Sequence, residues 1–135
     1  IIRVESRFDP EAESRKGARG LMQVMPETGV EVALRLGVLD FTTDMLFDPE
    51  VNIRIGSCYL ASLGAQLGPN LPTILAAYNA GHGNVERWLA GGIWDGTDEN
   101  IEDIPFRETR DYVKNVLRAY RRYKSIYRSF PAVRG

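Results

Sequence analysis

Apolar residues recur along most of the chain at the three- and four-residue spacing of α-helices, and no stretch alternates as a β-strand does. The clearest segment begins at Asp48-Pro49, where a capping side chain precedes a proline at the first helical position. It runs until Gly68, with an apolar residue at every fourth position: Val51, Ile55, Tyr59, Leu63 and Leu67. The pattern predicts an all-α fold.

Proline and glycine divide the rest of the chain. We expect a first helix that ends at Asp9-Pro10 and places Ile1, Val4 and Phe8 on one stripe. A polar loop over residues 11–20 and an apolar run over 21–25 come next. The remaining predicted elements are helices over 27–36, from Pro72 to Gly81 and over 85–89, an acidic loop over 94–103, and a last long helix with Tyr112, Val116, Tyr120, Tyr123 and Tyr127 on one face.

Composition narrows the function classes. A length of 135 residues fits one domain, and 44% hydrophobic with 26% charged residues is an ordinary globular mix. The net charge of −1 argues against a dedicated nucleic-acid binder. Since no apolar run approaches the ~20 residues of a membrane span, we predict no membrane segment.

The single cysteine and single histidine exclude several kinds of chemistry. Cys58 has no partner for a disulfide, and with His82 alone it cannot form a conventional zinc site. No serine or cysteine triad through another histidine is possible. We interpret Cys58 as a small buried apolar group, in preference to a reactive thiol. Any hydrolytic or transfer chemistry must therefore rest on carboxylates, tyrosines or the imidazole. We expect no cofactor and no metal.

The last helix is locally basic, since residues 107–128 hold eight Lys or Arg against two acidic residues. A nucleic-acid-binding arm is one interpretation. The favoured one is structural, because arginines near a helix C-terminus suit the helix dipole and their stems can cover the tyrosine stripe.

Three segments carry polar side chains that packing alone does not require. Glu5 lies on an apolar helix, where burial would raise its pKa as a general acid at neutral pH requires; a surface glutamate is the alternative. Gln23 lies in a glycine-containing segment that either contacts a sugar or packs as a tight loop. Tyr78 and Asn79 stand at a helix end, either aimed into a cleft or forming an ordinary helix terminus.

The order of these segments resembles a known family. Glu-Ser, then Gly-Ala-x-Gly-Leu-Met-Gln-x-Met-Pro, then Ala-Tyr-Asn-Ala-Gly, and finally Ile-Pro-Phe-Arg-Glu-Thr-Arg-Asp-Tyr-Val over residues 104–113 resemble the catalytic domain of soluble lytic transglycosylases, relatives of goose-type lysozyme. The resemblance runs from residue 3 to about 123. It implies one lysozyme-like domain over residues 1–135 with a sugar-binding cleft, in which the start of the first helix is missing and which is part of a longer protein.

The resemblance also implies roles for individual residues. Glu5 matches the single catalytic acid/base, and Tyr78 the tyrosine whose hydroxyl approaches it. The positions that match substrate-binding residues are Ser6, Ser14, Gln23, Met25, Asn79, Glu102 and Tyr112. His82 stands where the family often has proline; we favour a solvent-facing loop residue over a proton shuttle.

The implied reaction cuts the β-1,4 bond between N-acetylmuramic acid and N-acetylglucosamine and leaves a 1,6-anhydromuramic end. Peptidoglycan strands are the expected partner, and the periplasm or cell envelope the expected location. One alternative is a lysozyme-type hydrolase in which a second carboxylate delivers water. Its candidates are Glu11, Glu13, Glu27 and Glu102. Another alternative is a non-catalytic glycan-binding module.

Overall fold

The computed structural model describes residues 1–129, and all regular structure in that range is helical. The α-helices are α1 (Ile2–Ser6), α2 (Pro26–Arg35), α3 (Pro49–Leu67), α4 (Leu71–Ala80), α5 (His82–Ala90) and α6 (Arg107–Arg128). Two 3-10 helices, η1 (Thr43–Phe47) and η2 (Ile101–Asp103), and isolated β-bridges that join Glu13, Arg19 and Val24 complete it. The all-α prediction is confirmed.

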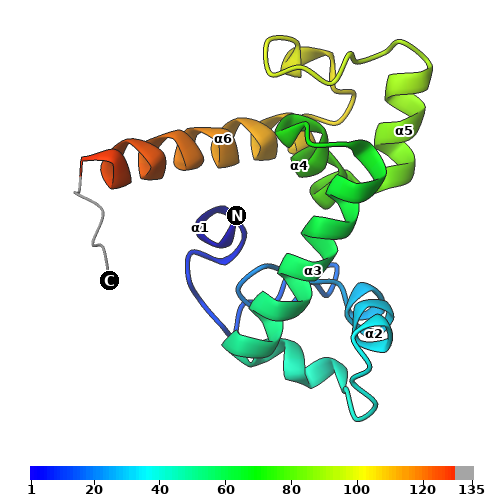
Figure 1. Cartoon of the computed structure of the whole chain (residues 1–135), viewed down its shortest axis with the longest axis vertical. Coiled ribbons are helices and arrows are strands. Elements are labelled where there is room, and N and C mark those ends of the chain that lie inside the picture. The colour runs from blue at the N-terminus through cyan, green and yellow to red at the C-terminus, as the bar shows by residue number, and fades with distance from the viewer. Residues whose placement is uncertain (130–135) are drawn as a thin grey trace. The chain divides into compact units, whose positions relative to one another are not determined.

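The structure divides into two compact units, residues 1–69 and the residues from Asn70 onward (Figure 1). The first contains α1, α2, η1 and α3, and the second contains α4, α5, η2 and α6. The single domain expected over residues 1–135 stays a prediction, and each unit is described on its own.

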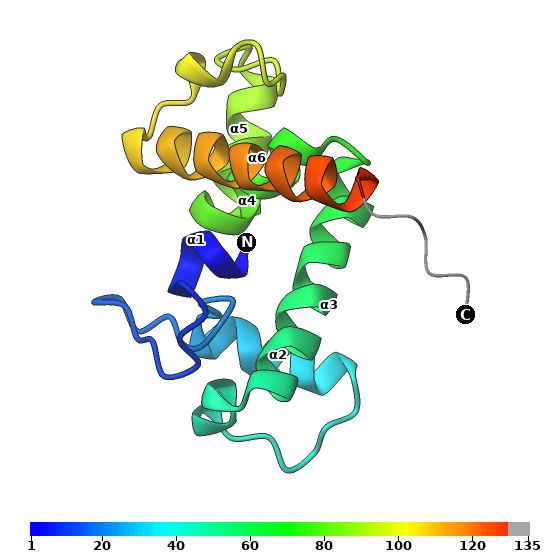
Figure 2. The same cartoon turned by 90° about the vertical axis from the view of Figure 1, so that its left-hand side faces the viewer.

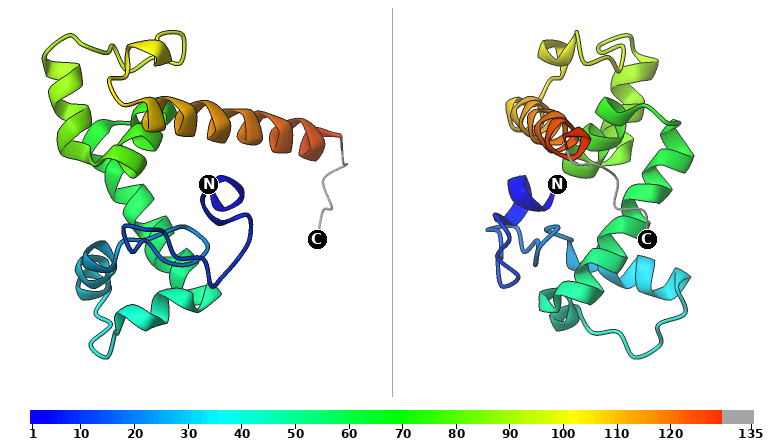
Figure 3. Two further views of the ribbon diagram at one scale, coloured as in Figure 1. Left: turned by 180° about the vertical axis from the view of Figure 1, so that it is seen from behind. Right: turned by 60° about the vertical axis from the view of Figure 1, so that its left-hand side comes forward.

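In the first unit, α2 and η1 pack against α3 (Figure 3). The Asp48 side chain accepts a hydrogen bond from the Val51 N–H at 3.1 Å, which caps α3, and Gly68 ends it with a φ of +85°. Both ends of this helix are therefore where the sequence predicts them. The buried apolar residues of this unit are Leu21, Met22, Val24, Val32, Ala33, Leu46, Ile55 and Leu63.

The first helix is shorter than predicted. α1 ends at Ser6, because Arg7 and Phe8 adopt left-handed backbone conformations with φ of +52° and +64°. Phe8 therefore does not continue a buried stripe, and it is 59% exposed. The predicted end at Asp9-Pro10 is wrong.

In the second unit, α4 packs against both α5 and α6 (Figure 2). The Asn70 side chain caps α4 by accepting a hydrogen bond from the Thr73 N–H. The Trp88 and Phe106 rings meet edge to face with centroids 5.1 Å apart. The buried apolar residues of this unit are Leu75, Ala76, Ala77, Val85, Trp88, Trp94, Ile101, Ile104, Tyr112, Val113, Val116 and Leu117.

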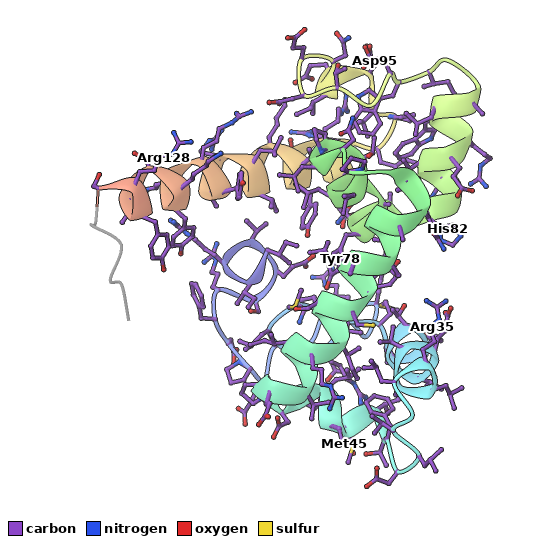
Figure 4. The ribbon with its side chains drawn as sticks, viewed as in Figure 1. Arg35, Met45, Tyr78, His82, Asp95 and Arg128 are labelled. Carbon is purple, nitrogen blue, oxygen red and sulfur yellow. The ribbon has the colours of Figure 1, made fainter. Side chains whose placement is uncertain are left out.

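The helix after α4 begins earlier than predicted. Gly81, with a φ of +88°, ends α4 and also precedes the first residue of α5, so the chain turns there without a loop. His82 is the first residue of α5 and is exposed (Figure 4). It faces solvent as expected, but it belongs to a helix and not to a loop.

The tyrosine stripe of α6 is buried only in its first part. Tyr112 and Val116 are 6% and 5% exposed, whereas Tyr120 and Tyr127 are 50% and 72% exposed. The arginine stems therefore do not cover the second part of the stripe. Cys58 is half-buried on α3. Among the described residues, no helix has the length and apolarity that a membrane span requires.

Candidate active site

Glu5 lies on the single turn of α1 and is half-buried. The residue after it, Ser6, is buried, and its hydroxyl donates to the Leu21 carbonyl oxygen at 2.8 Å; the Ile2 carbonyl oxygen lies farther away, at 3.1 Å. An isolated helix of one turn is not stable in water. The bond to Leu21 therefore attaches the turn that carries Glu5 to a segment fifteen residues later in the chain.

The Leu21 carbonyl oxygen belongs to the peptide group between Leu21 and Met22, and a side chain of α3 binds the other side of this group. Its N–H, which belongs to Met22, donates to Asn52 Oδ1 at 2.8 Å. Asn52 is fully buried, and its Nδ2 donates to the carbonyl oxygens of Arg19 and Leu46, both at 2.8 Å. Every proton of the Asn52 amide is thus used. The Leu21–Met22 peptide connects α1 to α3 through two buried hydrogen bonds.

Two glycines permit the close approach of this segment to its neighbours. A Cβ on Gly20 would lie 2.2 Å from the Leu46 carbonyl oxygen and 2.3 Å from Asn52 Nδ2, and Gly20 has a φ of +76°. A Cβ on Gly56 of α3 would lie 2.4 Å from the Met22 sulfur. Larger side chains at these positions would displace the segment.

Gln23 follows this peptide and has a left-handed backbone with a φ of +49°. Its Nε2 donates to the carbonyl oxygens of Ala12 and Gly20, at 3.0 and 2.9 Å. The sequence left two interpretations open for this side chain, contact with a sugar or packing in a tight loop. The structure uses both amide protons inside the protein, and within the described residues no hydrogen bond reaches its amide oxygen.

The other two predicted site residues of the first unit lie on either side of Gln23 in the chain. Ser14 is exposed, and its hydroxyl accepts a hydrogen bond from the Ala18 N–H at 3.0 Å, which closes a tight turn. Met25 is half-buried and precedes α2 as its N-cap residue.

In the second unit, Tyr78 (labelled in Figure 4) lies in the last turn of α4, and Asn79 follows it there. Both residues are half-buried. The Asn79 side-chain oxygen accepts a hydrogen bond at 2.8 Å from the hydroxyl of Thr109, a buried residue of α6. This bond fixes the end of α4 to α6. The motif is therefore more than a helix terminus, because one of its side chains joins two helices.

Glu102 and Tyr112 belong to the same unit. Glu102 is exposed in η2, and its carboxylate accepts a hydrogen bond from Lys114 of α6. That hydrogen bond, together with the positive charge of Lys114, lowers the pKa of Glu102. Tyr112 is buried on α6.

The structure thus connects Ser6 and Gln23 through one segment of the first unit, and it fixes Asn79 and Glu102 to α6 in the second. The sequence analysis assigns no role to Asn52, although the sequence contains one signal for it. Asn52 is a polar residue on the apolar side of α3, three positions before Ile55. A polar residue at a core position indicates buried partners.

Comparisons with known proteins give consistent matches. "Transglycosylase SLT domain" matches residues 1–101 and "Soluble lytic transglycosylase helical domain" matches residues 103–132. The soluble lytic murein transglycosylase of Salmonella typhimurium is 43% identical over 133 residues, which cover 96% of this chain and 20% of the relative.

Two solved structures are similar to the chain over most of its length. A complex of the 70-kDa soluble lytic transglycosylase with bulgecin A is 41% identical, with a TM-score of 0.85, over 96% of this chain and 21% of that one. An inactive glutamate-to-glutamine mutant of lytic transglycosylase Slt from Pseudomonas aeruginosa is 44% identical, with a TM-score of 0.76, over 87% and 19%. The chain spans about a fifth of the length of these relatives, and the matches confirm its fold class.

Proposed function

The chain belongs to the transglycosylase SLT domain family, and from that membership we propose that it is a lytic transglycosylase acting on murein, the peptidoglycan of bacterial cell walls. The observation that carries the proposal is the turn of Glu5. The family's acidic residue is present there, half-buried, and its neighbour Ser6 is fixed by a buried hydrogen bond to Leu21. An inactive glutamate-to-glutamine relative supports a catalytic glutamate in this family.

The proposed reaction needs one carboxyl group. Protonated Glu5 gives its proton to the glycosidic oxygen between N-acetylmuramic acid and N-acetylglucosamine, and that bond breaks. The 6-hydroxyl of the muramic acid attacks its own anomeric carbon and loses its proton to Glu5. The 1,6-anhydro ring forms, Glu5 is protonated again and no water is consumed. The attack is fast because the nucleophile is already part of the substrate.

Each remaining site residue has a proposed role. The hydroxyl of Tyr78 orients the carboxyl of Glu5 and stabilises the charge that develops at the sugar. Ser6 holds the turn of Glu5 in addition to its predicted contact with substrate. The residues proposed to position the sugars in a cleft are Ser14, Gln23, Met25, Asn79, Glu102 and Tyr112; of these, Gln23 offers its amide oxygen.

Substrate and location follow from the same proposal. Peptidoglycan strands are the partner, the cell envelope is the place of action, and the periplasm is its proposed compartment. Because a similar protein is bound to bulgecin A in its structure, we extend bulgecin A binding to this chain. The lysozyme-type alternative has less support, because its candidate second carboxylates are exposed, and Glu13 and Glu102 are paired with Arg19 and Lys114.

Mass spectrometry of the muropeptides released from purified peptidoglycan tests the proposal. We expect 1,6-anhydro ends from the unmodified chain and almost none from Glu5→Gln, with Glu86→Gln, an exposed glutamate on α5, as the matched control. Reducing ends, which are heavier by one water, would establish the hydrolase instead. Binding without any cleavage would establish the glycan-binding module.

A further inference from the structure

The second part of α6 carries an excess of positive charge. Six Lys or Arg residues and no acidic residue lie from Lys114 to Arg128, which leaves 11 basic against 18 acidic residues for the rest of the chain. A nearly neutral protein therefore carries a strongly basic segment on an acidic body. Such a separation orients a protein toward anionic surfaces.

The basic side chains lie beside exposed aromatic rings. Tyr120, Tyr123 and Tyr127 recur at three- and four-residue spacing and are 50%, 38% and 72% exposed. Arg121, Lys124 and Arg128 recur at the same spacing, one position later, and are exposed as well. We call these six residues the basic tyrosine face. Its two stripes are in contact, since the Lys124 ammonium lies 5.8 Å from the centre of the Tyr120 ring.

The basic side of this face is hollowed. A shallow cavity of about 460 Å³ is lined, among the described residues, by Arg121, Lys124, Ser125, Arg128 and Ser129. Arg121 forms an ion pair with Asp98, whereas Lys124 and Arg128 form none within residues 1–129. The Ser129 hydroxyl donates to the Ser125 carbonyl oxygen at 3.1 Å, so within the described residues two cations and the Ser125 hydroxyl are left to an external ligand. Arg128 lies in the last turn of α6, at the end away from α4 (Figure 4).

We propose that the basic tyrosine face is an accessory binding surface for the peptide-bearing peptidoglycan strand, formed by residues other than the proposed catalytic ones. The carboxylates of the stem peptides pair with Lys124 and Arg128, and sugar rings stack on the exposed tyrosines. The choice of this polymer rests on the proposed function. Binding here raises the local concentration of the strand and leaves the chemical step unchanged.

Charge and side-chain type favour this occupant. Peptidoglycan offers carboxylates and sugar rings in one polymer, which match the cations and the flat aromatic rings. Helices that lie in lipid surfaces instead present Trp, Phe and Leu on their apolar side, and Ile126 is the one exposed aliphatic residue on this half of α6 within the described residues.

Co-sedimentation of the whole chain with insoluble peptidoglycan tests the proposal, in a Glu5→Gln background so that the polymer is not consumed. Lys124→Gln/Arg128→Gln is compared with Arg35→Gln/Arg54→Gln, which removes the same charge from exposed positions of α2 and α3. We expect the first pair to raise the apparent Kd about 5- to 10-fold in low-salt buffer, and the second to leave it unchanged. Melting curves confirm that each variant is folded.

Peptide-stripped glycan strands identify the ligand. The unmodified face should bind them only as well as Lys124→Gln/Arg128→Gln binds intact polymer. Equal binding of intact and stripped polymer, or an unchanged Kd in that variant, overturns the proposal. If Lys124→Gln/Arg128→Gln loses binding to anionic phospholipid vesicles but still binds peptidoglycan as the unmodified face does, the proposal is overturned in favour of a lipid surface. Failure of the proposed function gives a different result: the chain with its native Glu5 would then release no 1,6-anhydro ends, regardless of how the α6 variants bind.

Discussion

Replacement of Asn52 by alanine is the perturbation from which the structure predicts the largest effect at a distance from the proposed chemistry. The substitution removes the Asn52 hydrogen bond from two buried groups, the Met22 N–H and the Leu46 carbonyl oxygen, whereas the Arg19 carbonyl oxygen keeps its bond from the Val24 N–H at 3.0 Å. Each buried polar group left unsatisfied costs about 1–3 kcal/mol. We therefore expect Asn52→Ala to lower the free energy of unfolding by roughly 2–6 kcal/mol, a large part of the ~5–15 kcal/mol typical of a domain.

The shared peptide group makes a sharper prediction. Ser6 and Asn52 hold the two sides of the Leu21–Met22 peptide, so loss of one bond lets the peptide shift and weakens the other. In a double-mutant cycle, Ser6→Ala and Asn52→Ala should therefore couple by at least about 0.5 kcal/mol, where independent sites add within about 0.3–0.5 kcal/mol. Turnover should fall in the folded fraction of each variant, because both displace the turn of Glu5.

Urea unfolding and steady-state turnover of the four proteins in the cycle measure these effects. Asn115→Ala, which replaces an exposed asparagine of α6, is the matched control and should change neither quantity. Strictly additive unfolding free energies, or full turnover by folded Asn52→Ala, would refute the connection from α3 to α1.

Three further predictions concern the glycines of the first unit, Tyr78 and Glu102. Gly20→Ala should lower the free energy of unfolding, measured in urea, by more than about 3 kcal/mol, because a Cβ there meets the Leu46 carbonyl oxygen. Gly17→Ala, at a φ of +91° with nothing within 4 Å, should lower it by only about 1–2 kcal/mol of backbone strain. Equal losses would contradict the close approach at Gly20. Tyr78→Phe should lower kcat on the order of 10- to 1000-fold with little change in KM or Tm, and an unchanged kcat would return Tyr78 to a packing role. The hydrogen bond from Lys114 lowers the pKa of Glu102 in the folded protein. The stability that this pair contributes is therefore present above the unfolded pKa near ~4.3 and is lost as the pH falls through the folded pKa. The difference in Tm between the unmodified chain and Glu102→Gln should shrink in acid, and a difference that grows there would be inconsistent with the pair.

Local signals were enough to predict some elements and not others. The ends of α3 follow from a capping aspartate, a proline and a glycine, all within the residues that form those ends. The end of α1 does not, because Ser6 is held by a carbonyl fifteen residues away and the two residues after it turn left-handed. A periodic pattern contains no information on such a contact.

The candidate site divides in the same way. Glu5, Gln23 and Tyr78 stand in ordered motifs, so the sequence could name them. Asn52 forms its hydrogen bonds with backbone groups of Arg19, Met22 and Leu46, which only the folded chain brings to it. Likewise, the engagement of both Gln23 amide protons depends on the path of the loop and could not be predicted from residue type.

The central claim is that Glu5 serves a reaction in which the substrate supplies its own nucleophile. Digestion of purified peptidoglycan in heavy-oxygen water tests this most directly, with mass spectrometry of the released ends. We expect 1,6-anhydro ends without heavy oxygen, and no release by Glu5→Gln. Ends that carry one heavy oxygen would show that water attacks the sugar, and would contradict the single-carboxylate mechanism.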